Sequence, residues 1–324
     1  MPLNRFLPFS AASLLLLAMG CTHTQQTGPS FSVYVVENGT TGSSLLQLPA
    51  NNGSVTPANT ITVPMQTTYQ ALAVDTAGNL YVSASNSATT PAVNEILVYA
   101  PTATGAATAT STITSSSLTA AATSIAVDAT GTVYALSGNS ILVFAAGSGV
   151  NTTPVRLITG AATLLNSASA IAVDSVQNIY VANTAGGNVL VFSSIQTGNV
   201  APSSILAGSS TQISMPIGVA VDLAGDIYVA SYNKPSTSSV IMEFAPGATG
   251  NVAPTKSLTS VASDAVAGLA VDVLNNLYVV TDTATSNILA VDVFSPSASG
   301  SNGPASTITS SAWTTSTYGQ VAVR

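Results

Sequence analysis

Apolar strings that end in aspartate recur five times along the chain. The copies are Ala71–Asp75, Ser124–Asp128, Ala170–Asp174, Gly218–Asp222 and Gly268–Asp272. Their aspartates lie 46 to 53 residues apart, and the same order of turns and apolar runs follows each of them. A regular period of this length is typical of a repeat architecture, in which each unit buries its faces against its neighbours.

Each unit contains four short apolar runs separated by turn residues. After the aspartate comes a turn rich in Gly and Asn, then a run with a central tyrosine such as Leu80-Tyr81-Val82. A third run ends on an aromatic residue, as in Ile141–Phe144, and a fourth follows, as in Thr255–Thr259. Short runs bounded by Gly, Asn and Pro predict strands, and no segment has the period and caps of a helix. Four strands per unit indicate the blade of a β-propeller.

The two ends of the repeat region predict how the ring closes. Val33–Val36 matches the second strand of a unit although no first strand precedes it, and Gln320–Arg324 matches a first strand. The last strand should therefore complete the first blade, which removes the open edges of the ring. The prediction is an all-β domain over residues 31–324, a six-bladed β-propeller with four antiparallel strands per blade.

Composition limits the classes of function. Hydrophobic residues make up 46% of the chain and charged residues 5%, with five basic against twelve acidic side chains. Nucleic-acid binding needs clustered Lys and Arg, which this sequence lacks. One cysteine cannot form an internal disulfide, so packing and sheet hydrogen bonds must hold the fold. The Ser- and Thr-rich surface suits a protein outside the cytoplasm.

The N-terminus has the pattern of an export signal. Arg5 precedes an apolar run that peaks at Leu14–Leu17 and is too short to span a bilayer, which predicts a signal peptide over residues 1–20. Small residues precede Cys21, so the segment resembles a bacterial lipobox, and Cys21 becomes the expected lipidation site. Residues 21–30 would be a polar tether, and Thr22 favours the outer membrane or cell surface. The alternative is ordinary secretion to the periplasm or medium.

The Ala-Val-Asp string, the Gly-Asn turn, the Tyr-Val pair and the later Val-Phe pair resemble the NHL repeat. The resemblance covers residues 31–324, and similar blades occur in six-bladed gluconolactonase-like propellers. It implies the fold more specifically than the function, since propellers host many activities. NHL-like modules are mostly binding scaffolds, whereas related lyases rely on histidines and metal and related lactonases on calcium held by Glu, Asn and Asp.

Candidate catalytic chemistry is sparse. The only histidine is His23 in the tether, so the acid–base and metal sites of the lyases are not expected. A lactonase-like calcium site is kept as an alternative, with Glu37, Asn183 and Asp282 as ligands because they follow second strands on blades 1, 4 and 6. The simpler alternative for these three residues is loop capping. The repeat aspartates are expected to close turns by hydrogen bonding.

Aromatic residues outside the repeat pattern are the candidates for ligand or partner binding. Removing the repeat tyrosines and third-strand aromatics leaves, among the tyrosines and the tryptophan, Tyr69, Tyr232, Trp313 and Tyr318, and Asn233 adjoins Tyr232. The positions of the four aromatics predict that they map to one face, where exposed rings would recognise a protein or glycan. The alternative is that they fill the mouth of the central channel.

These patterns favour a non-catalytic, exported binding or scaffold module that recognises a protein or glycan through loops on one propeller face. It is expected to be a monomer with no cofactor, to contact the membrane only through a lipid anchor and to bind no nucleic acid. Two alternatives are a calcium-dependent hydrolase of the gluconolactonase-like type and a structural cell-surface protein.

Overall fold

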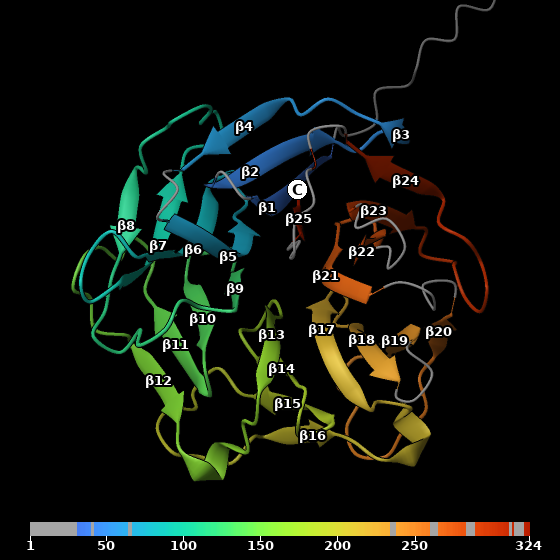
Figure 1. Ribbon diagram of the computed structural model, residues 1–324. Helices are drawn as coiled ribbons and strands as arrows, with labels where there is room; N and C mark the ends of the chain where they lie inside the picture. Colours follow the sequence, from blue (N-terminus) through green and yellow to red (C-terminus); the bar gives the residue numbers. More distant parts are fainter. Residues whose placement is uncertain are drawn as a thin grey trace, which may run out of the picture. The chain divides into compact units, whose positions relative to one another are not determined.

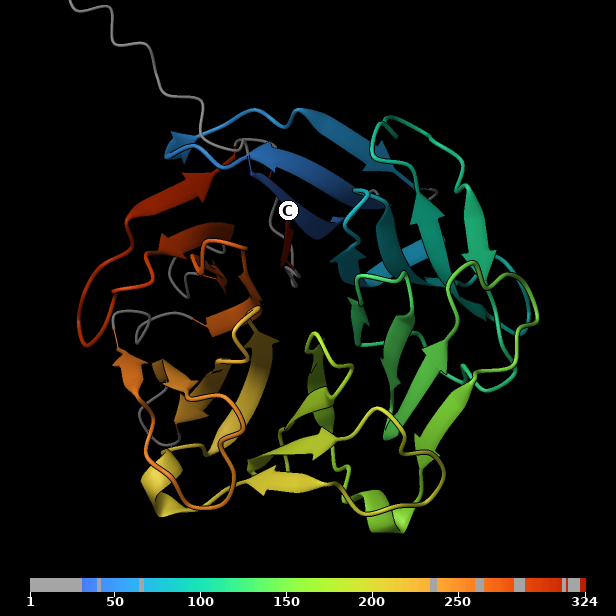
Figure 2. The same ribbon diagram turned by 180° about the vertical axis from the view of Figure 1, so that it is seen from behind.

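The computed structural model describes residues 31–39, 42–63, 67–233, 238–259, 265–282, 289–310, 313 and 321–324. For residues 38, 39, 233, 238, 265, 282 and 289 the backbone alone is described. Residues 31–324 form one compact unit, in which six β-sheets are arranged as blades around a central axis (Figure 1). Figure 2 shows the same ring from behind.

Each blade has four main strands, which follow one another from the innermost to the outermost. Blades 1 and 2 are β25 (Val321–Val323), β1 (Ser32–Gly39), β2 (Gly42–Pro49) and β4 (Asn59–Thr62), and β5 (Thr67–Val74), β6 (Leu80–Asn86), β7 (Val93–Tyr99) and β8 (Ser111–Ile113). Blades 3 and 4 are β9 (Ser124–Val127), β10 (Val133–Ser137), β11 (Ser140–Phe144) and β12 (Arg156–Thr159), and β13 (Ala168–Val173), β14 (Ile179–Asn183), β15 (Asn188–Phe192) and β16 (Ser204–Leu206). Blades 5 and 6 are β17 (Met215–Val221), β18 (Ile227–Asn233), β19 (Ser238–Phe244) and β20 (Lys256–Leu258), and β21 (Ala265–Val271), β22 (Leu277–Asp282), β23 (Leu289–Phe294) and β24 (Ser306–Thr309). Two 3-10 turns, η1 (Ala161–Thr163) and η2 (Ser209–Thr211), lie in connections between blades.

The predicted ring closure is confirmed. Strand β25 from the end of the chain pairs antiparallel with β1, with Val33 opposite Val323 and Val35 opposite Val321. Ser32 and Arg324 extend this ladder by one residue pair: the N–H of Ser32 donates to the carbonyl of Arg324 at 2.9 Å, and the N–H of Arg324 donates to the carbonyl of Ser32 at 3.2 Å. Blade 1 therefore combines strands from the two ends of the repeat region, and its innermost strand contacts both β5 and β21.

The core lies between the blades. Six apolar clusters are found among the described residues, and each spans two neighbouring blades around the ring. The aromatic residues that end the third strands are buried as predicted: Tyr99, Phe144, Phe192, Phe244 and Phe294. Every blade thus depends on both neighbours for its apolar burial, as the repeat period indicates.

A hydrogen-bonded turn explains the fixed spacing of aspartate and tyrosine. In blade 6, Asp272 Oδ1 accepts from the backbone N–H groups of Leu274 and Asn276 at 2.8 Å. Its Oδ2 accepts from Asn276 Nδ2 at 2.8 Å and from the hydroxyl of Tyr278 at 3.1 Å. Burial and the adjacent carboxylate raise the pKa of Tyr278, which keeps its hydroxyl protonated as the donor. The other four repeat aspartates accept the same two backbone bonds and the bond from the repeat tyrosine, which confirms their structural role.

The outer edges of the blades are covered by the neighbouring blade. Parallel bridges join Gly105 to Ile61, Gly198 to Ile158, Gly250 to Leu206 and Gly300 to Leu258. Residues of the connection after β11 hydrogen-bond to Thr114 beyond β8, and β3 (Gly53–Ser54) pairs parallel with β24. Because these contacts occupy the edge groups of the outer strands, strand addition at the outer rim is disfavoured.

Candidate functional site

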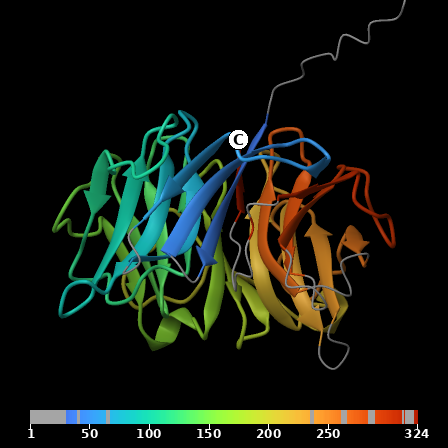
Figure 3. The same ribbon diagram turned by 45° about the horizontal axis from the view of Figure 1, so that its top comes forward.

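The ring has two faces, and the strand directions assign each segment to one of them. In blades 2 to 6 the first strand runs toward its aspartate turn, and the third strand ends beside that turn, as Phe144 does opposite Val133. We call this end the Asp-turn face; it carries the turns after first and third strands. The opposite end, which carries the connections between blades, is called the loop face. Figure 3 shows the strands running between the two faces.

One buried position per blade holds the connections of the loop face in place. Ser137 Oγ donates to the carbonyl of Ala120 at 2.8 Å, and Ser231 Oγ accepts from the N–H of Ser214 at 3.0 Å. In both cases the partner lies 17 residues earlier, in the connection that leads into the same blade. The six residues at this position are buried: Glu37, Ala84, Ser137, Asn183, Ser231 and Thr281. Where its side chain is polar and its contacts are described, the position anchors a loop.

Asn183, one of the candidate calcium ligands, has this anchoring role. Its Oδ1 accepts from the N–H of Asn166 at 2.6 Å, again 17 residues earlier. Its Nδ2 donates to the carbonyl of Leu164 at 3.1 Å and to Asn188 Oδ1 at 2.9 Å. These bonds match the loop-capping alternative of the sequence analysis.

The candidate calcium ligands lie on three blades, and the side chain of one of them lies outside the described residues. Glu37 is buried in blade 1, opposite blade 4 and Asn183 in the six-membered ring, and the side chain of Asp282 lies outside the described residues. Within the described part of the chain, no group of three or more His, Cys, Asp or Glu side chains is placed to hold a metal ion. The calcium site stays a prediction.

The expected exposure of Tyr69 is wrong. Its side chain is 0% exposed and packs in the cluster between blades 1 and 2. Its hydroxyl lies 2.8 Å from that of Tyr99, at the third-strand position where four blades have Phe. Burial strongly raises the pKa of Tyr69. Since Tyr69 lies within β5, with the alternating burial of a strand, it belongs to the core and not to the surface.

The remaining aromatic candidates are less exposed than predicted or lie outside the described residues. Trp313 is half-buried against the cluster between blades 6 and 1, and its indole Nε1 is buried. Tyr232 is half-buried near the end of β18 on the loop face. Tyr318, Cys21 and the side chain of Asn233 lie outside the described residues.

Exposed apolar side chains gather on the Asp-turn face, a surface outside the predicted binding candidates. Of the ten large hydrophobic side chains that are exposed in the described part of the chain, six lie on this face. They are Val155, Val176, Ile195, Leu223, Val273 and Leu274. The signal was present in the sequence, since the two turn positions after the aspartates hold Val176, Leu223, Val273 and Leu274, where polar residues are usual.

The turns of blades 2 to 5 surround a depression of about 400 Å³ on this face. Thr76, Thr130, Ser175, Val176, Gln177 and Leu223 line it, together with the buried Asp128 and the partly buried Asp174. Gln177 Nε2 donates to Asp128 Oδ2 at 2.7 Å and so links blades 3 and 4. Nearer the middle of the ring, a cavity of about 50 Å³ is lined by the innermost strands of all six blades.

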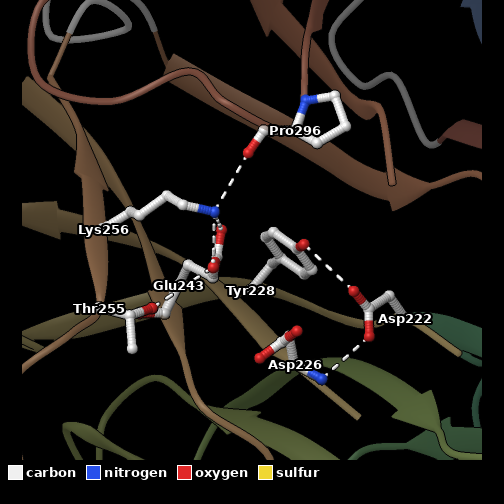
Figure 4. A network of polar contacts seen from close by, with 7 residues as sticks. All are labelled: Asp222, Asp226, Tyr228, Glu243, Thr255, Lys256 and Pro296. Atoms are coloured by element: carbon white, nitrogen blue, oxygen red, sulfur yellow. Dashed lines mark hydrogen bonds and ion pairs between the residues drawn. The ribbon is translucent and has the colours of Figure 1, made fainter. Parts of the chain in front are cut away.

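A polar network joins blades 5 and 6 on the same face (Figure 4). Lys256 Nζ lies 2.9 Å from both carboxylate oxygens of Glu243 and donates to the carbonyl of Pro296 at 3.1 Å. Burial raises the pKa of Asp226, the carboxylates of Asp222 and Glu243 raise it further, and Lys256 opposes them. Three other blades have Asn where blade 5 has Asp226.

No helix among the described residues is both long enough and apolar enough to cross a membrane. The sequence matches no family model and no curated protein. Several solved structures are similar in fold, including a nidogen/laminin complex with 15% identity and a TM-score of 0.58, covering 90% of this chain and 98% of that one.

Two further similar structures are of proteins named as lactonases. A periplasmic gluconolactonase of Pseudomonas aeruginosa has 13% identity and a TM-score of 0.55, covering 82% of this chain and 80% of that one. A putative 6-phosphogluconolactonase of Bacteroides uniformis ATCC 8492 has 14% identity and a TM-score of 0.54, covering 84% of this chain and 81% of that one. At these identities the likeness shows the fold alone: the chain is a six-bladed β-propeller.

Proposed function

We propose that the chain is an exported, non-catalytic binding module whose Asp-turn face docks a protein partner. The observation that carries the proposal is the concentration of exposed aliphatic side chains on that face. Single exposed apolar residues are ordinary, but a group of them at one end of a molecule marks an interaction surface. The proposal keeps the binding function predicted from the sequence and moves it to the other face of the ring.

The rest of the described surface offers fewer modes of binding. The outer strand edges are covered by neighbouring blades, so a partner cannot readily extend a sheet. On the loop face, Ser137, Asn183 and Ser231 are engaged in fixing the connections. Among the described residues, the turns of the Asp-turn face therefore carry most of the exposed apolar surface.

The chemistry of the Asp-turn face favours a protein over a glycan. Its exposed apolar side chains are Val, Leu and Ile, which pack against other aliphatic and aromatic side chains through burial of area. Sugar rings are preferentially recognised by stacking on flat aromatic rings, and the repeat aromatics are buried, apart from the partly buried Tyr81. A protein partner is thus part of the proposal.

Export and lipid anchoring complete the proposal and rest on the sequence of residues 1–21. If Cys21 carries a lipid, the wild-type protein will sediment with membranes. The Cys21→Ser variant will then leave the membrane fraction. Equal sedimentation of the two proteins would overturn the lipid anchor and leave the binding proposal intact.

The binding proposal is tested by capture of envelope proteins with a matched control. The triple variant Val176→Asn, Leu223→Asn and Val273→Asn removes exposed apolar groups from the Asp-turn face. The control Leu164→Asn removes one from the loop face, where the φ of 61° suits Asn. We expect wild type and control to retain the same protein, quantified by mass spectrometry, and the triple variant to lose it. Retention by all three, with unchanged melting temperatures, would overturn the proposal.

A further inference from the structure

The Asp-turn face carries a ring of carboxylates around the channel mouth. Each of blades 2 to 6 contributes the aspartate that directly follows its first strand. In blade 1 the equivalent position is Arg324, next to Val323 of β25. Its guanidinium lies against Gly78 in the turn of blade 2. The charge at the mouth is therefore negative over blades 3 to 6 and offset near blades 1 and 2.

Within the depression this negative charge meets apolar surface. The carboxylates of Asp128 and Asp174 belong to its lining, as do the exposed side chains of Val176 and Leu223. No Lys, Arg or His is among the lining residues that the structure describes. An occupant of the depression would meet aliphatic contacts together with two nearby carboxylates.

The carboxylate of Asp128 is held in its charged form by its surroundings. Burial alone would raise its pKa, but hydrogen bonds from Thr130, Thr132 and Gln177 outweigh burial and keep the pKa below its usual value. Asp174 accepts two backbone bonds, one bond from Asn178 and one from the hydroxyl of Tyr180. These donors are neutral, and no cationic side chain is among the described lining residues. Arg156 lies outside the lining, with its guanidinium carbon 5.7 Å from the centre of the Tyr134 ring behind Asp128.

We propose that the depression binds an exposed protein segment in which a lysine or arginine is flanked by apolar side chains. This inference rests on the proposed function, because it names the chemistry of the partner at the Asp-turn face. Charge complementarity supplies orientation and specificity, and the aliphatic rim supplies burial of area.

The same charges disfavour other occupants. A second copy docked face to face would bring two sets of carboxylates together, and like charges repel across an interface. An anionic lipid surface would be repelled in the same way. The volume of about 400 Å³ suits one long side chain with its neighbours, because ligand pockets begin at roughly 300 Å³.

The test uses the full-length protein and three acetylated tripeptide amides. The first probe is leucyl-arginyl-leucine; the second has neutral citrulline in place of arginine, and the third has glutamate. Binding to immobilised protein is measured by surface plasmon resonance at about 50 mM and about 500 mM salt, which spans the range of strong screening. We expect the arginine peptide to bind about tenfold more tightly than the citrulline peptide, the order of effect of one charge-assisted contact, and to lose that advantage at high salt.

A matched pair of protein variants locates the effect. Ser175→Lys places a cation at the exposed turn of blade 4 that lines the depression, while Ser210→Lys places the same charge on the loop face. We expect the first variant to weaken binding of the arginine peptide about tenfold and the second to leave it unchanged. Both side chains are exposed, so neither change should alter folding.

Failure of this inference is distinguishable from failure of the proposed function. Equal affinity of the arginine and citrulline peptides, no binding of the arginine peptide, or no effect of Ser175→Lys would each overturn the cationic segment. If the triple apolar variant still loses its captured protein in that case, the Asp-turn face remains the binding face and only its charge preference is wrong.

Discussion

Replacing Asp226 by Asn should stabilise the propeller, because three other blades already use Asn at this position. There the amide Nδ2 donates to Oδ2 of the turn aspartate, at 2.7 Å from Asn79 and 2.8 Å from Asn178 and Asn276. In blade 5 the backbone turn is the same, since the N–H of Asp226 donates to Asp222 Oδ1 at 2.9 Å. Its carboxylate supplies no such amide donor and instead adds a charge near Asp222 and Glu243.

The expected gain is the value of one hydrogen bond to a carboxylate at a partly buried site. Such bonds contribute about 1.5–3 kcal/mol, and partial exposure lowers the estimate to about 1–2 kcal/mol. For a domain of this size, that corresponds to a rise in melting temperature of about 2–4 °C per kcal/mol. The reverse swap, Asn178→Asp in blade 4, should destabilise the protein by a similar amount and serves as the matched control.

The gain should depend on pH with a defined sign. The pKa of Asp226 is higher in the folded state than in the unfolded state. The stability that comes from its protonated form is therefore complete below the pKa of the unfolded state and is lost as the pH rises through the pKa of the folded state. Asp226→Asn removes that loss, and the stability difference between variant and wild type should be smallest near pH 3 and largest near neutrality. Urea unfolding of both proteins at several pH values measures it. A gain that shrinks as pH rises, or a stabilising Asn178→Asp variant, would refute the reasoning.

Three further predictions concern closure, the buried tyrosine pair and metal. Removing residues 321–324 deletes β25 from blade 1 and so removes the buried side chains of Val321 and Ala322 and the backbone bonds to Ser32. The free energy of unfolding, measured with urea, should fall by about 4–6 kcal/mol. An unchanged urea midpoint would contradict closure by β25. Tyr69→Phe should lower the free energy of unfolding by about 1–3 kcal/mol because it removes the partner of the buried Tyr99 hydroxyl. Adding Tyr99→Phe to this variant should restore most of the lost stability, and additive losses in the double-mutant cycle would contradict the pairing. Since Asn183 is engaged in loop bonds, thermal melts with calcium and with chelator should coincide, and a chelator-sensitive melt with one bound calcium would revive the hydrolase alternative.

Much of the fold follows from the sequence because each repeat encodes the same local turn. An aspartate six residues before a tyrosine brings together a carboxylate, two backbone N–H groups and a hydroxyl, as at Asp272 and Tyr278. Closure was predictable from two partial units, Val33–Val36 and Gln320–Arg324, which only a ring can combine. These features depend on residue type and spacing alone.

The candidate site was harder to predict because it depends on side-chain direction. The sequence pattern predicts an exposed ring for Tyr69, but β5 begins at Thr67, and the alternation of buried and exposed residues from Thr67 to Ala71 places the ring in the core. A bulge between Tyr69 and Ala71 interrupts the register just beyond it. The apolar turns around Leu223 were visible in the sequence, yet their meaning required the ring, which gathers turns from separate blades on one face.

The most direct measurement of the central claim is photo-crosslinking in intact cells from two exposed positions on opposite faces. A photoreactive amino acid at position 223 lies on the Asp-turn face, and one at position 164 lies on the loop face; both native leucines are at least half exposed, at 71% and 50%. If the Asp-turn face docks a protein, the probe at position 223 will crosslink to one discrete protein and the probe at position 164 will not. The same crosslinked protein from position 164, with none from position 223, would contradict the claim.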